Sequence, residues 1–338
     1  MDALLSLPVL GYFMMPGLFA SYSTSLNLLF FYMTWSTLVL SHSPLKVEIL
    51  GTLGVRLLFF LIPSTLFLLF DTLLPSLTVG IKTQGASALP TRTGGRKVSR
   101  RSASRPEWYQ VVGLSIFNVC LGAAIQAAVE VFFTEVLNIR SALKVTTTLP
   151  MPWSILKDII RGLLLRETLQ YYIHRFVLHP NSANFVSDLH TKYFHSITAP
   201  YAFAVHYDHP LPYILLRVLP VYLPSLIFRE HLLTHLLFLS LVTLEETLTF
   251  SGYTTMPGIM LGGLTRRQDL HSASKGKGNF APWGLLDWIH GTSIGQDVIE
   301  DLRGEADKHQ VKERGNKVVD SAKESGRAWN GRRKSRKA

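Results

Sequence analysis

The apolar residues of this chain are gathered into long blocks, and no other feature of the sequence constrains its fold as much. The blocks are 26–40, 57–70, 110–133, 211–228 and 232–244. A helix of about 20 apolar residues can cross the hydrocarbon core of a bilayer, because it satisfies its backbone hydrogen bonds internally. The blocks therefore predict an all-α, multi-spanning membrane protein with roughly four to six apolar helices. Arg56 and Asp71 flank the strongest block and are expected to reach the membrane surfaces with their charged ends.

Charge is scarce in this chain and is gathered outside the apolar blocks. Only 17% of the 338 residues are charged, and the formal net charge is +11. Seven Lys and Arg residues lie between Lys82 and Glu107, and twelve lie between Asp301 and Ala338. Basic segments beside apolar spans are typical of the cytosolic side of a membrane, where they meet anionic lipid headgroups. The sequence has no recognition motif for nucleic acid, so no nucleic-acid partner is expected.

The apolar blocks and the basic segments together divide the chain into four parts. We expect N-terminal membrane helices over 1–75, a basic, flexible cytosolic linker over 76–107, a membrane domain with a histidine-rich cap over 108–295 and a basic cytosolic tail over 296–338. The linker is expected to be flexible because it lacks hydrophobic periodicity. The first apolar stretch, 4–19, is interrupted by two prolines and fits either an interfacial or a short spanning helix.

Histidine is the residue that carries a chemical signal in this chain. Four histidines fall within 22 positions, and three more lie in neighbouring polar segments. The seven are His174, His179, His190, His195, His206, His209 and His271. Cys120 is the only cysteine, which excludes internal disulfides, thiolate zinc sites and iron–sulfur clusters. Many imidazoles without thiols suit iron, copper or zinc, and at a membrane surface they suggest oxidation of a lipid-like substrate.

The first two histidines stand five residues apart at the end of an amphipathic segment. Residues with this spacing differ in direction by about 140° on an ideal α-helix and do not share a face. Pro180 disfavours the α-helical conformation at His179, so we expect the helix to end before His179 and the turn to bring its imidazole back towards His174. Glu167 and Tyr171 lie on the helical face of His174, and Glu167 is placed to orient a metal-bound imidazole. The alternative is an ordinary solvent-exposed helix end.

A second pair, His231 and His235, has the spacing of neighbours on one helix face. His231 precedes Phe250 by nineteen residues, a distance of about 28 Å at 1.5 Å per residue. We therefore expect this pair to lie near the opposite membrane interface and to have a structural role.

The order and spacing of the histidine motifs resemble those of a known family. The strings are YYIHRFVLHP, LHTKYFHSITAPYAFAVHYDHPLPY, FSGY and RRQDLHSASKGKGNFAPWGLLDWIHGT, all within 152–295. They are similar to the histidine boxes of the fatty acid hydroxylase/sterol desaturase superfamily. The resemblance implies a membrane-embedded enzyme whose boxes face the cytosol and hold two irons. It also implies O2-dependent hydroxylation or desaturation of a lipid, sterol or terpenoid-like substrate, with electrons from cytochrome b5 or its reductase.

The same resemblance assigns roles to residues of this chain. The metal ligands that it implies are His174, His179, His190, His195 and His271, with His206, His209 and Glu246 as weaker candidates. Glu167, Tyr171 and Asp269 are the candidates for residues that orient these ligands, and Glu245 is a further substitute carboxylate.

Four positions depart from the family pattern. Phe194 and Phe250 stand where the second box and the HSGY motif have histidine, and Gln268 and Ser272 replace two histidines of the last box. A phenyl ring cannot coordinate iron, and Gln and Ser are poor substitutes for a neutral imidazole. The alternative function is therefore that of a metal-depleted member, with a non-redox, isomerase- or cyclase-like role or a lipid-binding role. The family also implies a multi-pass protein of the endoplasmic reticulum that takes part in lipid biosynthesis.

Overall fold

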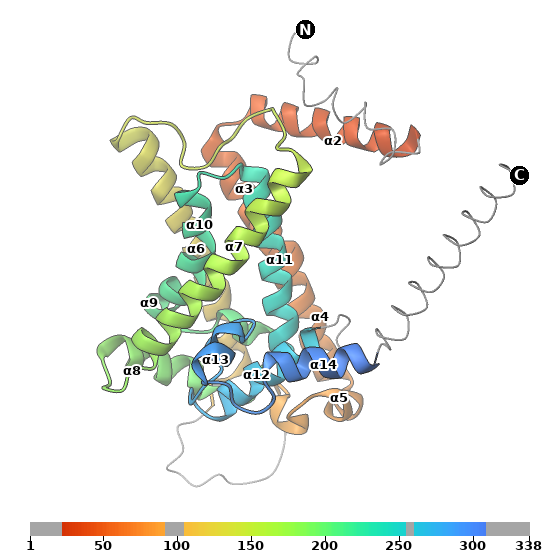
Figure 1. The fold of residues 1–338 in the computed structure, drawn as a ribbon, viewed down its shortest axis with the longest axis vertical. Helices are drawn as coiled ribbons and strands as arrows, with labels where there is room; N and C mark the ends of the chain where they lie inside the picture. The colour runs from red at the N-terminus through yellow and green to blue at the C-terminus, as the bar shows by residue number, and fades with distance from the viewer. Residues whose placement is uncertain (1–21, 92–104, 255–259, 309–338) are drawn as a thin grey trace, which may run out of the picture.

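The computed structural model describes residues 22–91, 105–254 and 260–308. Figure 1 shows a bundle of helices that run lengthwise, with α2 (Tyr22–Ser41) across one end. Shorter helices gather at the opposite end and form a cap. The cap helices are α5 (Pro75–Ile81), α8 (Phe185–Tyr193), α12 (Leu261–Ala273), α13 (Leu285–His290) and α14 (Val298–Lys308).

Four helical stretches of the described residues are long and apolar enough to cross a membrane. They cover 44–73, 108–136, 210–227 and 232–250. The first span joins α3 (Pro44–Arg56), the π-helical turn η2 (Leu57–Leu61) and α4 (Ile62–Leu73). The second joins α6 (Trp108–Val131) and the π-helical turn η4 (Phe132–Val136). The third joins α9 (Pro210–Tyr213), η8 (Ile214–Val218) and α10 (Leu219–Ile227), and the fourth is α11 (Leu232–Phe250). The described residues form no β-strands, and only isolated bridges such as Lys82 to Tyr253 occur. The prediction of an all-α, multi-spanning membrane protein is confirmed.

The bundle is apolar outside and partly polar inside. Leucines of the first span, among them Leu58 and Leu66, are exposed, as expected for side chains that face lipid tails. Inside, the Tyr222 hydroxyl donates to Glu48 at 2.9 Å, and the Thr52 hydroxyl donates to Gln126 at 2.9 Å. These buried polar groups need such partners because the hydrocarbon offers none. They tie the spanning helices to one another.

α7 (Pro152–Ile173) is the amphipathic helix that connects the two ends of the bundle, and it leads directly into the π-helical turn η5 (His174–Leu178). It packs along α10 and α11, and Gly162 gives Phe238 room to approach, since a Cβ there would lie 3.2 Å from the Phe238 ring. This packing fixes the position of the first two histidines relative to the spans.

Some expectations from the sequence are wrong. The charged ends of Arg56 and Asp71 do not extend outward from the helix: both are buried, Arg56 donates to a threonine hydroxyl of α11 at 3.0 Å, and Asp71 forms an ion pair with Lys82. Internal partners are available to these charges, so they do not need water. The segment 26–40, expected to span, forms α2, which lies across the end of the bundle.

The basic segments are partly folded. The segment expected to be a flexible linker over 76–107 begins with α5, and the backbone N–H of Thr83 donates to the carbonyl of Gly252 at 2.9 Å. The tail expected over 296–338 begins with α14, whose Asp301 pairs with Arg266 and Arg267 of α12. Residues 92–104, 309–338 and the N-terminal stretch 4–19 lie outside the described part of the chain.

Candidate metal centre

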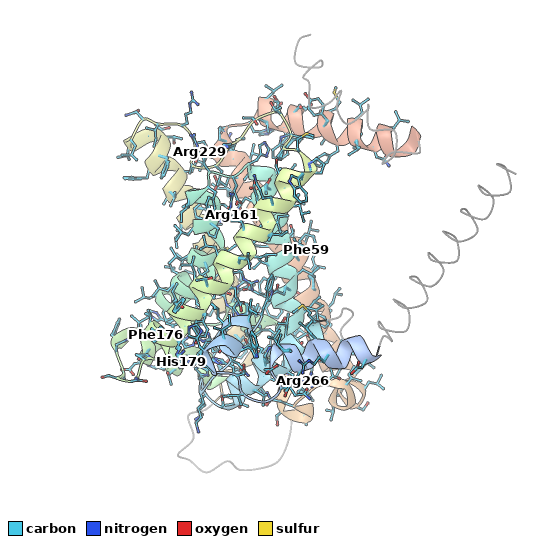
Figure 2. All side chains as sticks on the ribbon, in the orientation of Figure 1. Phe59, Arg161, Phe176, His179, Arg229 and Arg266 are labelled. Carbon is cyan, nitrogen blue, oxygen red and sulfur yellow. The ribbon has the colours of Figure 1, made fainter. Side chains whose placement is uncertain are left out.

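Five histidines from three separate elements meet in the cap. His174 and His179 come from the end of α7, His190 and His195 from α8 and the short 3₁₀ turn that follows it, and His271 from α12. Figure 2 labels His179 at the cap end of the bundle, far from Arg161 and Arg229 at the other end. These five residues, here called the histidine cage, are the five that the sequence motifs single out.

A π-helical turn brings the first two histidines together. The backbone N–H of His179 donates to the carbonyl of His174 at 2.9 Å, a bond between residues five apart. Such a turn holds one residue more than an α-turn, so residues with this spacing return to the same face. The two rings lie 5.1 Å apart. The helix ends before His179, as expected: its last turn, to Leu178, widens into a π-turn, and His179, before Pro180, leaves the helical conformation with φ −125° and ψ 52°.

The cage is narrow. One nitrogen from each of His174, His179, His190 and His271 can be chosen so that all four lie within 4.8 Å of one another. Nitrogens on opposite sides of one metal ion are about 4.2 Å apart when the bonds are about 2.1 Å long. Shifts of a few tenths of an ångström would bring all four into bonding range of one ion. His195 completes the cage, with its Nε2 atom 3.1 Å from the Nε2 atom of His179.

Three histidines are oriented by contacts on their outer nitrogen. The Nδ1 atom of His174 lies 2.9 Å from the carbonyl of Phe280, and the Nδ1 atom of His271 lies 2.7 Å from the carbonyl of Gly278. The Nδ1 atom of His190 lies 2.6 Å from Oδ2 of Asp208. Metal-bound histidines in proteins are usually held in this way, by a carbonyl or carboxylate on the nitrogen that does not bind the metal.

The inner nitrogens of these three histidines are buried and have no hydrogen-bond partner. They are the Nε2 atoms of His174, His190 and His271, and the Nδ1 atom of His195 is unpartnered as well. A buried polar atom without a partner destabilises the fold by about 1–3 kcal/mol, so four such atoms in one cage are strongly destabilising. Coordination to a metal would satisfy them, so the residues present fit a metal ion.

The cage favours neutral imidazoles, the form that binds metals. Burial lowers the pKa of His179 to about 2 and that of His271 to about 4. Burial also holds the pKa of His174 and His195 well below its ordinary value. The neighbouring imidazoles of the cage lower the pKa of all four residues further, because a second positive charge in the cage is repelled.

The part of the chain that contains the cage is similar in sequence to known proteins. Residues 159–292 match the model of the family described as fatty acid hydroxylase. The chain is 30% identical over 131 residues to fatty acid hydroxylase domain-containing protein 2 of Homo sapiens and equally to that of Macaca fascicularis, over 38% of this chain and 36% of each relative. It is 28% identical over 146 residues to fatty acid hydroxylase ahd1 of Mycosarcoma maydis, over 43% of this chain and 36% of that protein. The chain thus spans about a third of the length of these relatives, and no solved structure matches it.

The matched region resembles the fatty acid hydroxylase family. The resemblance predicted from the histidine motifs is confirmed. The matched region contains most of α7, the cage and the spans 210–227 and 232–250, and it therefore includes the elements that position the five histidines.

The departures from the family pattern gather on one side of the cage. The Phe194 ring stacks on His190, with centroids 4.9 Å apart and planes 14° apart, and it contacts the Phe250 ring edge-on at 6.0 Å. Gln268 donates to the hydroxyl of Ser272 at 3.3 Å. Phe194, Phe250 and Gln268 line a cavity that also reaches His174 and has an empty volume of about 450 Å³, its open mouth included.

A network of charged side chains also lines this cavity. Arg166 of α7 donates to Glu245 at 3.0 Å and to Glu246 at 3.1 Å, and Arg217 of η8 donates to Glu246 at 2.8 Å. The Trp283 indole donates to the second oxygen of Glu245 at 2.9 Å. Two cations and two carboxylates thus neutralise one another between α7, η8, α11 and the loop of the cap.

The residues expected behind the ligands lie elsewhere. Glu167 accepts hydrogen bonds from the backbone N–H groups of Trp283 and Leu285 at 2.9 and 3.0 Å, so it holds the cap loop 283–286 and does not contact an imidazole of the cage. The ring of Tyr171 stacks on His290 at 4.9 Å. Asp269 is hydrogen-bonded to Thr83 and Gln84, which follow α5.

The weaker ligand candidates also have partners outside the cage. His206 lies 3.4 Å from Arg56 and packs edge-on against Phe60 at 4.4 Å. His209 begins α9 and accepts a hydrogen bond from a backbone N–H at 3.3 Å. Glu246 is held by the two arginines of the charge network. At the far end of α11, the Nδ1 atom of His235 lies 2.9 Å from a buried serine hydroxyl, away from the cage.

Sequence reasoning missed Asp208, the carboxylate behind His190. It stands between His206 and His209 in a motif already singled out, so a carboxylate within a histidine-rich string was the available signal. The contacts of the Gly278 and Phe280 carbonyls could not be predicted from residue types, because every residue has a backbone carbonyl. Gly276 was missed too: its φ is +81°, and a Cβ there would lie 2.1 Å from the His179 ring.

Proposed function

We propose that this chain is a membrane-bound, O2-dependent oxidoreductase that hydroxylates or desaturates a hydrophobic lipid, sterol or terpenoid-like substrate. One observation carries the proposal: the region that matches the family model presents a cage of five histidines, four of which have a buried nitrogen without a partner, beside a cavity at the end of a membrane bundle. Iron is the metal that the family resemblance implies, and His174, His179, His190 and His271 would hold it, with His195 beside them.

When bound, the metal would supply the activation of O2 that breaks an unactivated C–H bond. The protein supplies position and a dry environment. The carbonyls of Gly278 and Phe280 and the carboxylate of Asp208 hold three imidazoles in one orientation, and Phe194 and Phe250 keep an apolar surface next to them. Water is thereby kept from the face of the cage that adjoins the cavity.

The cavity beside the cage lies between two membrane spans and has both apolar and polar walls. Phe194, Phe250 and Leu216 provide apolar walls, while Arg166 and Gln170 provide polar ones. Because the spans α9–α10 and α11 both contribute to it, a substrate that arrives from the bilayer reaches the cavity between helices and not through bulk water.

The overall reaction needs an external reductant. Hydroxylation consumes one O2, two electrons and two protons and yields an alcohol and one water. The described residues hold no flavin or haem domain, so we propose that cytochrome b5 or its reductase supplies the electrons. The basic segments beside the spans support docking of an acidic donor on the cytosolic side, and residence in the endoplasmic reticulum is part of the proposal.

Labelled O2 tests this function. Microsomes that contain the full chain are incubated with isotopically labelled O2 and NADH, and the lipid extract is analysed by mass spectrometry. We expect a lipid that carries the label in a new hydroxyl group, or a newly desaturated lipid. Neither product is expected with His174→Ala or His190→Ala, whereas His231→Ala, at the far end of the bundle, retains them. Lipid turnover that persists without O2 would instead favour the isomerase- or cyclase-like alternative.

A further inference from the structure

We infer that the histidine cage holds one metal ion per chain, and not the pair of irons that the family resemblance implies. The inference rests on the proposed function, because it concerns the metal that this function requires. Three observations support it: the width of the cage, the residues at the replaced positions, and the partners of the nearby carboxylates.

The width of the cage suits a single ion. Two metal ions that act together in an enzyme are about 3.5–4 Å apart, so the outermost nitrogens of such a pair are separated by about 8 Å. The four nitrogens of His174, His179, His190 and His271 all lie within 4.8 Å of one another. They surround one point, and a second ion would have to lie outside this group.

The fifth histidine does not create a second site. The Nε2 atom of His195 is 3.1 Å from that of His179, so both atoms face the same point. The His195 ring lies 5.1 Å from each of the rings of His190 and His271, within the same cage. His195 can therefore add its Nε2 atom to the first ion, and its unpartnered Nδ1 atom is a single nitrogen, too few to hold a second ion.

The replaced positions leave nothing for a second ion to bind. Phe194 and Phe250 present ring carbons to the space beside the cage, and their rings contact one another. Gln268 and Ser272 are hydrogen-bonded to each other at 3.3 Å. Neither side chain offers the imidazole nitrogen or the carboxylate that iron prefers.

The carboxylates near the cavity are also engaged. Glu246 accepts from both Arg166 and Arg217, and Glu245 accepts from Arg166 and from the indole of Trp283. Arg166 is only 2% exposed. If either carboxylate left Arg166 to bind a metal, the buried guanidinium would lack part of its compensating negative charge. The space beside the cage therefore belongs to the cavity and offers no free carboxylate to a second metal ion.

Counting metal in the intact protein tests the inference. Full-length chain in detergent is stripped with a chelator, loaded with Co2+ and dialysed, and cobalt per chain is measured by mass spectrometry. We expect one ion per chain in the wild type. We expect the same for the control His231→Ala, and loss of the bound ion in His174→Ala and His190→Ala.

A second measurement on the wild type avoids variants that fail to fold. A single high-spin Co2+ ion gives an electron paramagnetic resonance signal whose intensity accounts for all bound cobalt, whereas two coupled ions lose part of that intensity. Two ions per chain with a coupled signal would overturn the inference and leave the proposed function intact. No bound ion in protein that forms the labelled lipid would overturn the inference, and no ion together with no labelled product would overturn the proposed function as well.

Discussion

Gly276 lies directly over the ring of His179, and replacing it by alanine should displace that ring. The residue follows α12 with φ +81°, and its backbone N–H donates to the carbonyl of His271 at 3.0 Å, which fixes its position. A Cβ atom there would lie 2.1 Å from Cε1 of His179 and 2.6 Å from its Nε2. Since ordinary contacts begin near 3.4 Å, the ring must move by about 1.3 Å.

A shift of this size removes His179 from the metal. Metal–nitrogen distances are held within about 0.2 Å of their ordinary values, so a ring displaced by more than 1 Å no longer binds. Loss of a residue that only orients a ligand lowers metal affinity by about 10- to 100-fold. We expect a loss of at least this size in Gly276→Ala, measured as the dissociation constant for Co2+ or Zn2+ in competition with a chelator.

Gly291→Ala is the matched control. Gly291 also has a positive φ, +66°, and lies in the same cap, but a Cβ there would have no atom within 4 Å. Both variants carry a similar backbone strain of about 1 kcal/mol, because alanine tolerates positive φ poorly. Only Gly276→Ala should lose metal affinity. Equal affinities in the two variants would refute the placement of His179 as a ligand.

Three further perturbations follow from the contacts of the cage and the charge network. Asp208→Asn removes the charge behind His190, and metal affinity measured by the same competition should fall about 10- to 100-fold; unchanged affinity would exclude this orienting role. Burial holds the pKa of His271 at about 4, against 6.5 when exposed, so between these values the unfolded chain binds more protons. The free energy of unfolding of the metal-free protein should therefore fall by about 1.4 kcal/mol per pH unit from this residue as pH drops from 6.5 to 4, and a flat thermal-unfolding profile over this window would contradict it. Arg166→Met leaves the carboxylate of Glu246 short of a partner in a buried site and should destabilise the fold by about 3 kcal/mol in detergent unfolding, with a smaller loss for Arg166→Lys.

The fold class and the five histidines of the cage could be predicted from the sequence. The partners of Glu167 and Asp71 could not, for physical reasons. Apolar blocks of spanning length leave few alternatives to a helical bundle, and the five histidines could be chosen by their order and spacing. The role of Glu167 was not predictable, because helical periodicity gives the face of a residue but not which loop packs on that face. The ion pair of Asp71 with Lys82 was missed for the same reason: composition shows a charge beside an apolar block, but not a partner brought to it by folding.

The departures from the family pattern gained a meaning only from the structure. In the sequence, Phe194, Phe250 and Gln268 are missing ligands at three distant positions. In the fold they line one cavity, next to one cage, and face a common network of charges. Their proximity could not be read from spacing, because it depends on how α8, α11 and α12 meet.

The π-helical turn at 174–178 makes the centre depend on the length of the chain as well as on its residue types. Inserting one residue into this turn, for example after Val177, would place His179 six residues after His174 and turn it by about 100° around the helix axis. All five histidines would still be present in such a chain, yet the His179 ring would no longer face His174. An insertion in this short segment is therefore expected to be as harmful as the loss of a histidine, whereas removal of one residue would leave the two histidines four apart, on one face of a regular α-helix.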